Sequence, residues 1–288
     1  MTEHMKIDLH IHTTVSDGTV SPEMLPRLIE EAEIDIFSVT DHDAIKCTRI
    51  IPPLLREGGP VFIPGVEFSC KDEYGKYHIL GYAYDPNTPG IQEAVAYGHR
   101  LRIEKFKIRV NGLKQKFGFD FPEEELAKLF ALDNPGKPHL ANLMTKLGYA
   151  ESKEQAIREW IDSVRAPGTN HLRPEEAIKG ILASGGIPVL AHPCFGSGNE
   201  LILDEDLVLR VHRLVAFGLK GLEAFYSGFN EEHRRQVLDI AKRCGLYVTA
   251  GSDYHGTNKS VLLGDSGLAP GEPYPEGLVR FLHDTVHC

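Results

Sequence analysis

The sequence predicts an α/β fold in which strands and helices alternate, interrupted once by an all-helical segment. Short apolar strands recur with helical patterns between them, which is typical of parallel α/β units. The alternation stops near residue 89 and resumes near residue 169. Most of the predicted strands also carry His, Asp or Glu at or just beyond their C-terminal ends. In a (β/α) barrel, that edge is where active sites are built.

The composition and charge restrict the class of protein. The 288 residues are 42% hydrophobic and 25% charged, which is ordinary for a globular protein of one large domain or two smaller ones. No apolar run approaches a membrane span and no secretion signal is evident, so we expect a cytoplasmic protein without a membrane partner. Five cysteines without a CxxC pair argue for reduced thiols. The net charge of −10 disfavours a long nucleic acid but permits a small phosphorylated substrate at a metal site.

The first predicted strand carries the motif on which the candidate site depends. Apolar and polar residues alternate from Ile7 to His12. Because residues two apart on a strand share a face, His10 and His12 project together, about 6 to 7 Å apart. Two imidazoles so placed can reach one cation from the same side. An isolated HxH is more often a pair of polar residues on the wet face of an edge strand, so its meaning depends on the rest of the chain.

The elements before the helical segment follow in order. A loop at 13–19 leads into a helix with Ser21 as N-cap and Pro22 as its first residue. A second helix is expected around 49–57. Strands are expected at 34–39, 61–68 and 77–82. His42 follows the first of these three strands, and the other two contain Glu67 and His78.

The stretch from residue 91 to about 164 carries helical patterns and no strand signal. We expect helices at 92–117, after Pro122, at 139–147 and at 153–160. Residues 165–168 have the composition of a linker that returns the chain to the α/β part. We therefore interpret 89–168 as an all-helical insertion, and 5–88 with 169–288 as one α/β domain.

The α/β alternation then resumes. Helices are expected at 174–183, 205–217, 231–244 and 275–284. Strands are expected at 187–191, 221–225 and 247–250. Together with the four strands before the insertion, these make seven.

Residues of the types that bind metals recur at or near the predicted strand ends. They are His10, His12, Asp17, His42, Glu67, His78, His192, Asp253 and His255. Nine such residues are too many for one ion and suit two or three, with Glu67 as a bridging carboxylate. Imidazole with carboxylate fits Zn, Mn or Fe better than Mg or Ca. Each residue alone has an ordinary structural explanation, but nine at independent strand ends favour a metal centre.

These motifs resemble a known superfamily. His10-Ile11-His12, Ser16-Asp17-Gly18, Thr40-Asp41-His42-Asp43, Gly65-Val66-Glu67, His78, His192-Pro193 and Gly251-Ser252-Asp253-Tyr254-His255 are similar to the motif set of the PHP (polymerase and histidinol phosphatase) superfamily. The resemblance implies a distorted (β/α)7 barrel with an all-helical insertion domain. It also implies a hydrolase of phosphoric ester bonds with up to three metal ions.

The resemblance implies a ligand set for each ion. One ion would be held by His10, His12, Glu67 and Asp253, a second by Glu67, His78 and His192, and a third by Asp17, His42 and His255. The residues expected to act in catalysis are Asp17, His42, Glu67 and His255, with a hydroxide that bridges two metals as the nucleophile. Cys194 is expected to be a packed thiol.

The helical insertion resembles that of a subgroup acting on small phosphorylated sugars or nucleotides. We take as the first candidate substrate a ribose-type five-membered cyclic phosphate, hydrolysed in sequence to a free hydroxyl and inorganic phosphate. The alternative is a nucleoside 3′,5′-bisphosphate phosphatase. Further alternatives are an RNA 5′-exonuclease, a histidinol-phosphate phosphatase and a non-catalytic metal-binding module. The sequence leaves the oligomeric state open.

The same resemblance suggests where the substrate binds. We expect contacts from the insertion and from the turn after the sixth strand, through Arg102, Lys137, His139, Ser227 and Gly228. Arg100 and Lys105 lie on the first insertion helix and are expected on a solvated face.

Overall fold

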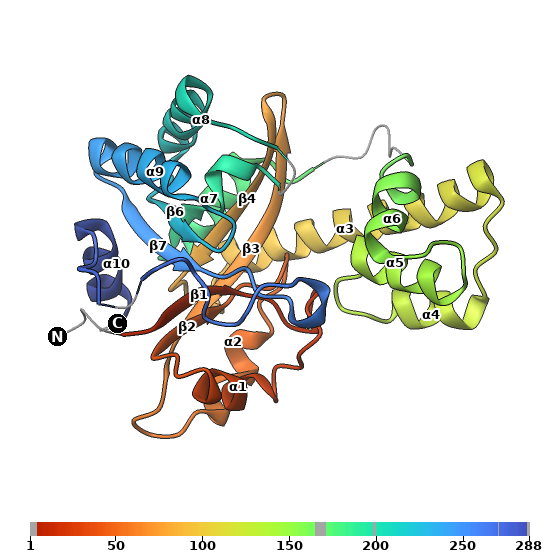
Figure 1. Ribbon diagram of the computed structural model, residues 1–288, viewed down its shortest axis with the longest axis horizontal. Helices are drawn as coiled ribbons and strands as arrows, with labels where there is room; N and C mark the ends of the chain where they lie inside the picture. The colour runs from red at the N-terminus through yellow and green to blue at the C-terminus, as the bar shows by residue number, and fades with distance from the viewer. Residues whose placement is uncertain (1–4, 165–170, 198–199, 270, 287–288) are drawn as a thin grey trace.

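Seven strands form one curved sheet in chain order in the computed structural model, which describes residues 5–164, 171–197, 200–269 and 271–286 (Figure 1). The strands are β1 Ile7–Ile11, β2 Ile36–Val39, β3 Val61–Asp72, β4 Gly75–Tyr82, β5 Ile187–Leu190, β6 Gly221–Tyr226 and β7 Tyr247–Gly251. The sheet closes between its two ends, where Ile11 pairs with Tyr254 just after β7. The His12 amide donates to Tyr254 O at 2.8 Å and the Tyr254 amide to His10 O at 3.2 Å. The predicted barrel is therefore confirmed, and its closure uses the His10–His12 segment.

One strand departs from the predicted parallel alternation. β4 pairs antiparallel with both β3 and β5. Only Glu73 and Tyr74 separate β3 from β4, whereas a parallel connection needs a dozen or more residues. β3 therefore runs on past the predicted end at residue 68 and turns back as a hairpin. His78 lies in the N-terminal half of β4 rather than at its C-terminal end, but it pairs with Ser69 and so still reaches the barrel mouth.

The helices surround the barrel or form a separate lobe. They are α1 Leu25–Glu31, α2 Cys47–Ile50, α3 Pro89–Phe117, α4 Glu123–Phe130, α5 Lys137–Lys146, α6 Lys153–Gln155 followed by a π-helical segment Ala156–Ile161, α7 Pro174–Ala183, α8 Asp204–Phe217, α9 Glu231–Cys244 and α10 Glu276–Val286. Short 3₁₀ turns lie at Pro52–Leu54, Pro193–Phe195 and Gly256–Asn258. Within the described ranges, none of the helices has the length and apolar character needed to cross a membrane.

Two predicted helices near the N-terminus were placed wrongly. The first starts at Leu25 with Met24 as N-cap, so Ser21 and Pro22 lie in the preceding turn. Met24 and Leu25 both donate their amides to the Ser21 carbonyl in that turn. The helix predicted at 49–57 is a short α2 followed by a 3₁₀ turn, because the prolines at positions 52 and 53 cannot continue an α-helix.

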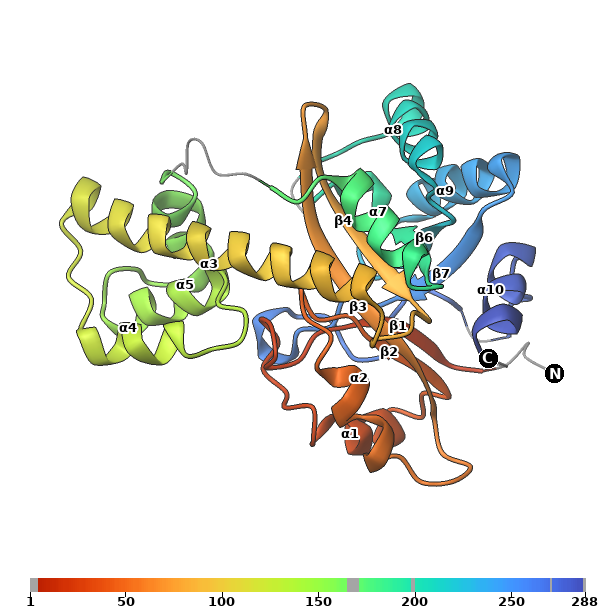
Figure 2. The ribbon, with the colours of Figure 1, turned by 180° about the vertical axis from the view of Figure 1, so that it is seen from behind.

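Helix α3 joins two hydrophobic cores. Its first half contributes Ile91 and Leu101 to the barrel core, while Phe106, Val110 and Leu113 in its second half belong to a second core with α4, α5 and the π-helical segment. Figures 1 and 2 show α3 running from the barrel into this helical lobe. We propose that the lobe is the insertion domain assigned above to 89–168; its last residues, 165–168, lie outside the described part of the chain.

The contact between α3 and α7 explains one glycine. A Cβ at Gly90 would lie 3.0 Å from the carbonyl oxygen of Gly180 and 3.0 Å from the Ala183 side chain. Glycine thus lets the start of α3 approach α7, which lies against the barrel. The long helix is fixed at its barrel end by this close approach.

The lobe core can be tested separately from the barrel. Phe106 is completely buried in the lobe, so Phe106→Ala should destabilise the structure it supports by about 3–5 kcal/mol. Hydrogen exchange should show faster exchange in α4 and α5, with the strands of the barrel unchanged. The matched control Phe281→Ala, buried in the barrel core, should give the reverse pattern. Equal loss of protection in both regions by Phe106→Ala would show that the lobe has no stability of its own.

Candidate metal centre

The barrel mouth brings together all nine residues that the sequence predicts as metal ligands. Eight are buried, with at most 7% of each residue exposed, and His78 is partly buried. Three groups have ligand atoms within 4.8 Å of one another: His12, Asp17, His42 and His255; His10, His12 and Glu67; and His42, Glu67 and His78. His12 and His42 each belong to two of these groups, so the groups form one continuous cluster.

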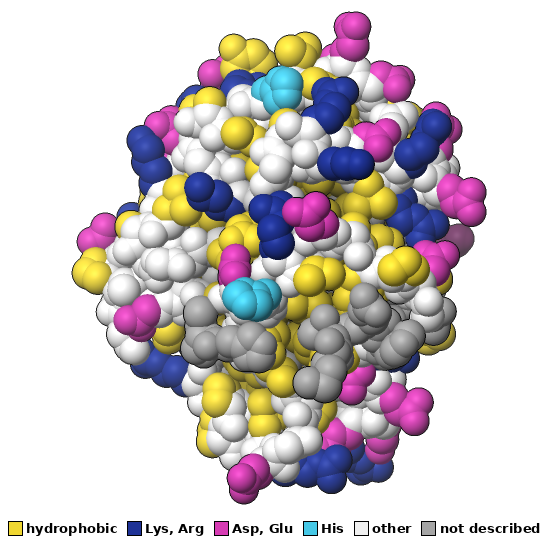
Figure 3. Space-filling model, turned by 90° about the vertical axis from the view of Figure 1, so that its left-hand side faces the viewer, with side chains coloured by type: hydrophobic (Ala, Val, Ile, Leu, Met, Phe, Trp, Pro, Cys, Tyr) yellow, Lys and Arg dark blue, Asp and Glu magenta, His cyan; other side chains and the backbone are white. Residues whose placement is uncertain are grey.

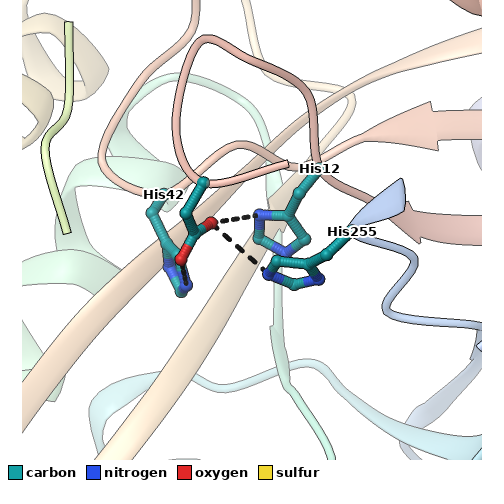
Figure 4. Close-up of side chains that lie close together, drawn as sticks. His12, His42 and His255 are labelled. Atoms are coloured by element: carbon teal, nitrogen blue, oxygen red, sulfur yellow. Dashed lines mark ion pairs between the residues drawn. The ribbon is translucent and has the colours of Figure 1, made fainter. Parts of the chain in front are cut away.

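The first group surrounds the carboxylate of Asp17. Its neighbours are the imidazoles of His12, His42 and His255, which Figure 4 shows close together. Asp17 Oδ1 lies 3.4 Å from His255 Nε2 and 3.7 Å from His12 Nδ1, and its Oδ2 lies 4.0 Å from His42 Nε2. Asp17 comes from the loop after β1, His42 follows β2 and His255 follows β7, so the group depends on the closure of the barrel.

Glu67 lies at the centre of the cluster. Its two oxygens face five imidazole nitrogens at 2.8–3.4 Å, from His10, His12, His42, His78 and His192. His10, His78 and His192 face Oε1, whereas His12 and His42 face Oε2. A carboxylate with each oxygen turned toward a different set of imidazoles has the geometry expected of a bridging ligand.

Several of these buried atoms lack hydrogen-bond partners, which supports a metal-binding role. His10 Nε2, His12 Nε2, Glu67 Oε1 and His192 Nδ1 are shielded from solvent and make no hydrogen bond. A buried polar atom without a partner costs roughly 1–3 kcal/mol. Divalent ions among them would supply that interaction, and imidazole with carboxylate oxygen fits Zn, Mn or Fe. The donor set therefore fits the metal centre that the sequence predicts.

The electrostatics of the cluster link metal binding to proton release. Burial disfavours the charged form of His12, but the facing carboxylates of Asp253 and Glu67 raise its pKa to about 9. Burial likewise opposes protonation of His10, yet the carboxylates of Glu223 and Glu67 raise its pKa well above the usual value. Metal ligation requires neutral imidazoles, so binding of ions at the cluster would release these protons.

The carboxylate of Glu223, which the sequence analysis missed, orients two of the predicted ligands. It is completely buried in β6 and accepts hydrogen bonds from His10 Nδ1 at 2.9 Å and from the His192 amide at 2.7 Å. The first bond turns His10 Nε2 toward Glu67, as outer carboxylates do around metal-binding histidines. The second bond holds His192 at φ +28°, a backbone conformation that a residue with a Cβ rarely adopts. The sequence signal that could have identified Glu223 is that it is the single acidic residue in the otherwise apolar strand Gly221–Tyr226.

Gly251 makes room for this arrangement. A Cβ at position 251 would lie 2.3 Å from His10 Cβ and 2.7 Å from Glu223 Oε1. Neither group can move without breaking the hydrogen bond between Glu223 and His10. The glycine of the Gly251-Ser252-Asp253 motif therefore has a packing role beside the ligand that follows it.

Two further buried acids shape the ligand-bearing loops. Asp41 accepts hydrogen bonds from the Thr13 amide at 2.8 Å and from Ser16 Oγ at 2.7 Å, which fixes the loop that carries Asp17. Asp8 accepts hydrogen bonds from the amide of Ser252 at 2.9 Å and from its hydroxyl at 2.6 Å. Burial raises the pKa of Asp8 to about 6, although these hydrogen bonds lower it.

Asp253 presents one oxygen to the cluster. Its Oδ1 lies 3.4 Å from His12 Nε2 and 3.5 Å from His10 Nε2. Its Oδ2 accepts a hydrogen bond from the Tyr226 hydroxyl at 3.1 Å and pairs with Lys259. Tyr226 and Lys259 therefore fix the orientation of this carboxylate, and neither was singled out from the sequence.

A cavity of about 290 Å³ opens beside the cluster. Asp17, His42 and His78 line it on the side of the cluster, and residues of α3, of the β3–β4 hairpin and of 135–138 form other parts of its wall. This volume lies near the lower end of the usual range for small-molecule sites, about 300–1,000 Å³. The cavity is the place where a substrate can meet the predicted ligands.

The predicted substrate residues differ in position. Arg102 and Lys137 line the cavity, where Arg102 pairs with Asp43 at 2.9 Å and Lys137 with Asp162. His139 accepts a hydrogen bond from the Gly136 amide at 3.0 Å and so caps α5. The Ser227 hydroxyl donates to Ser252 O at 2.9 Å. Neither Ser227 nor Gly228 is among the residues that line this cavity.

The two cations assigned to a solvated face of α3 have different environments. Arg100 is exposed, as expected. Lys105 is only partly exposed and lines the cavity, so the expectation was wrong for this residue. The helix turns Lys105 to the same side as Arg102, three residues earlier, and this side faces the barrel mouth.

Comparison with known proteins places the fold. No family model matches the chain. A solved structure from Bifidobacterium adolescentis, described as that of a candidate metal-dependent phosphoesterase, has a TM-score of 0.82 and 28% identity over 98% of this chain and 97% of that chain. The chain has the PHP fold. The predicted distorted barrel with its helical insertion is thus confirmed as to fold class.

Three curated relatives of similar length carry three different names. A 5′-3′ exoribonuclease of Haemophilus influenzae is 27% identical over 87% of this chain and 90% of its own length. A 3′,5′-nucleoside bisphosphate phosphatase of Chromobacterium violaceum is 26% identical over 86% of this chain and 87% of its own length. A phosphoribosyl 1,2-cyclic phosphate 1,2-diphosphodiesterase of Eggerthella lenta is 26% identical over 86% of this chain and 94% of its own length. All three names denote hydrolases of phosphoric ester bonds, in agreement with the class of enzyme predicted. The PHP fold, the ligand clusters and these relatives together support a metal-dependent phosphoesterase.

The role assigned to Glu223 can be tested without measuring turnover. Glu223→Gln keeps the size of the side chain, but the amide replaces one of its two acceptor oxygens and the negative charge is lost. Metal affinity, measured by titration of chelator-treated protein with Mn²⁺ or Zn²⁺, should fall by about 10–100-fold. The control Glu232→Gln changes an exposed acid on α9 and should leave the affinity unchanged. Wild-type affinity in the Glu223 variant would contradict the orienting role.

Proposed function

We propose that this protein is a metal-dependent hydrolase of small phosphate esters. The observation that carries the proposal is the set of buried imidazole and carboxylate atoms without hydrogen-bond partners around Glu67, at one side of a small cavity. The ligands assigned above to three ions lie in this cluster, and we keep that assignment as part of the proposal. Divalent ions held there would lower the pKa of water and offset negative charge on the phosphoryl oxygens.

The side chains of the chain itself then have distinct tasks. Asp17, His42 and His78 reach both the cluster and the cavity, so we propose that they lie closest to the scissile ester. We propose the catalytic role for Asp17, His42, Glu67 and His255. Arg102, fixed by Asp43 and by the Ser69 hydroxyl at 3.0 Å, would hold a phosphoryl oxygen at the cavity wall. Burial of the cluster limits water to the molecules that enter through the cavity.

The first candidate substrate is a ribose-type five-membered cyclic phosphate. One relative is named for hydrolysis of such a compound. Opening the ring breaks one phosphorus–oxygen bond, and the leaving oxygen stays attached to the same sugar. The resulting monoester is still in the cavity, where a second hydrolysis releases inorganic phosphate. The nucleoside 3′,5′-bisphosphate remains the alternative substrate, supported by a relative of equal identity.

An RNA 5′-exonuclease remains a further candidate, because another relative is named as an exoribonuclease. The size of the cavity favours a small molecule over a polymer, although an RNA end also fits a small site. Activity on a long RNA comparable to that on small phosphate esters would favour the exonuclease.

The metal cluster should be essential for turnover. The purified protein, loaded with Mn²⁺, should hydrolyse at least one of a panel of phosphomonoesters, bisphosphates and cyclic phosphates. His12→Ala removes a ligand that two of the groups share, and it should lower kcat by about 10³-fold or more, on the scale of losses of essential catalytic groups. The control His212→Ala alters an exposed histidine on α8 and should retain kcat. Near wild-type kcat in the His12 variant would exclude the proposed metal centre.

The order of hydrolysis can be read from oxygen incorporation. In ¹⁸O-labelled water, phosphate released from a cyclic diester through a monoester should carry two solvent oxygens, because each hydrolysis adds one. Phosphate released from a bisphosphate should carry only one. Phosphorus NMR separates these species and detects the intermediate monoester. Inert cyclic phosphates together with turnover of a nucleoside 3′,5′-bisphosphate would replace the first candidate by the alternative.

A further inference from the structure

Five basic side chains line the cavity beside the metal cluster. They are Lys76, Arg102, Lys105, Arg109 and Lys137. The chain as a whole has a net charge of −10. On the face at the end of the barrel away from the lobe, by contrast, basic and acidic side chains are interspersed (Figure 3). The concentration of cations in the cavity thus contrasts with this face and with the net charge of the chain.

Three of these cations come from one side of α3. Arg102, Lys105 and Arg109 stand three and four residues apart, the spacing that places side chains on one helix face. Arg102 pairs with Asp43, which directly follows the metal-ligand candidate His42. With a rise of about 1.5 Å per residue, Lys105 and Arg109 lie about 4.5 and 10 Å farther along the axis. In Figure 2 this direction leads from the barrel toward the helical lobe.

Two of the five cations are paired with carboxylates, whereas the partly buried Lys105 and Arg109 are not, and Lys76 is exposed. Arg102 donates to Asp43 through Nε and Nη2 at 3.0 and 2.9 Å, and Lys137 pairs with Asp162. The side chains of Lys105 and Arg109 make no hydrogen bond or ion pair with another residue in the described ranges. Their positions are nonetheless unfavourable for a charge, because burial lowers the pKa of Lys105 to about 8 and also lowers that of Arg109. The carboxylates of Asp43, near Lys105, and of Asp162, near Arg109, oppose this effect only in part, so a bound anion would stabilise both cations.

We propose that Lys105 and Arg109 form a second anion site, which binds a phosphoryl group of the substrate that is not hydrolysed. This inference rests on the proposed function, because the first phosphoryl group is the one at the metal cluster. Lys76, from the β3–β4 hairpin, adds a third cation to the same wall. The substrate class is then a ribose-type phosphate ester that carries a second phosphoryl group. A nucleoside 3′,5′-bisphosphate has this chemistry, and so does a pentose cyclic phosphate with a separate phosphate on the sugar.

The second anion site also argues against one alternative. Histidinol phosphate carries an ammonium group instead of a second anion. Lys105 and Arg109 would repel that group in a site of low dielectric constant. The same cations attract a phosphate, and Arg109 can bind it through two parallel hydrogen bonds.

Equilibrium binding tests the second site without turnover. Chelator-treated protein is titrated by calorimetry with adenosine 3′,5′-bisphosphate, adenosine 3′-monophosphate and adenosine 5′-monophosphate at low ionic strength. The bisphosphate should bind at least about tenfold more tightly than either monophosphate, because charge-assisted hydrogen bonds are among the stronger ones. Lys105→Gln with Arg109→Gln should abolish this difference. The control Lys107→Gln, an exposed residue of the same helix, should retain it.

A kinetic arm identifies which sugar phosphate uses the site. With Mn²⁺-loaded protein, kcat/KM is measured for a pentose 1,2-cyclic phosphate with and without a 5-phosphate, and for the bisphosphate beside the monophosphates. In each comparison, the double variant should lower kcat/KM by about tenfold or more only for the compound that carries the second phosphate. Equal binding of bisphosphate and monophosphates by the wild-type protein, or a double variant that binds like Lys107→Gln, would overturn the second site. Absence of turnover with every ester would refute the proposed function and leave the binding result valid.

Discussion

The structure depends on one buried carboxylate, Glu67, and on the five imidazoles that face it. Side chains of this kind are rarely buried without partners, since each loses its hydration. Here Nε2 of His10, Nε2 of His12 and Oε1 of Glu67 lack hydrogen bonds, while Nδ1 of His10 is held by Glu223. The protein therefore fixes the direction of the His10 imidazole and leaves the position between these three atoms for a cation. Strain at His192 and the packing requirement at Gly251 follow from the same arrangement.

Two irregular features of the barrel, its closure after β7 and the antiparallel strand β4, bring the candidate ligands together. Its closure is made by His12 and Tyr254, so the ligands at both ends of the sheet are brought together by the bonds that complete the barrel. The antiparallel β4 lets one tight hairpin present His78 opposite the end of β3, near Glu67. A strictly parallel strand would have needed a long connection at this point. The departure from regular (β/α) alternation thus serves the site.

The sequence indicates the residues that gather at the barrel mouth because their signals are local. The alternation around His10 and the polar residues after apolar strands can be recognised without knowing which strands are neighbours. Glu223 could not be assigned in this way, since its role depends on contact with His10 across 213 positions of sequence. The direction of β4 was misread because the strands predicted at 61–68 and 77–82 left residues 69–76 between them, so the two-residue turn of the hairpin was not recognised. Lys105 was misjudged because a charged helix face looks solvated until the hairpin and the 135–138 segment are placed opposite it.

The long helix α3 relates the two halves of the cavity. Its first part is packed in the barrel core and its second part in the lobe core. Arg102 is therefore anchored beside the metal cluster, where it pairs with Asp43. Arg109 stands in the sequence between Phe106 and Val110, which belong to the lobe core. A continuous helix keeps a nearly constant rise per residue. The separation between the reacting phosphoryl group and the second anion site is then set by the number of residues between their cations rather than by the docking of two mobile parts. Selectivity for the distance between two phosphoryl groups would follow from this one helix, whereas the metal centre alone would accept any exposed phosphate ester.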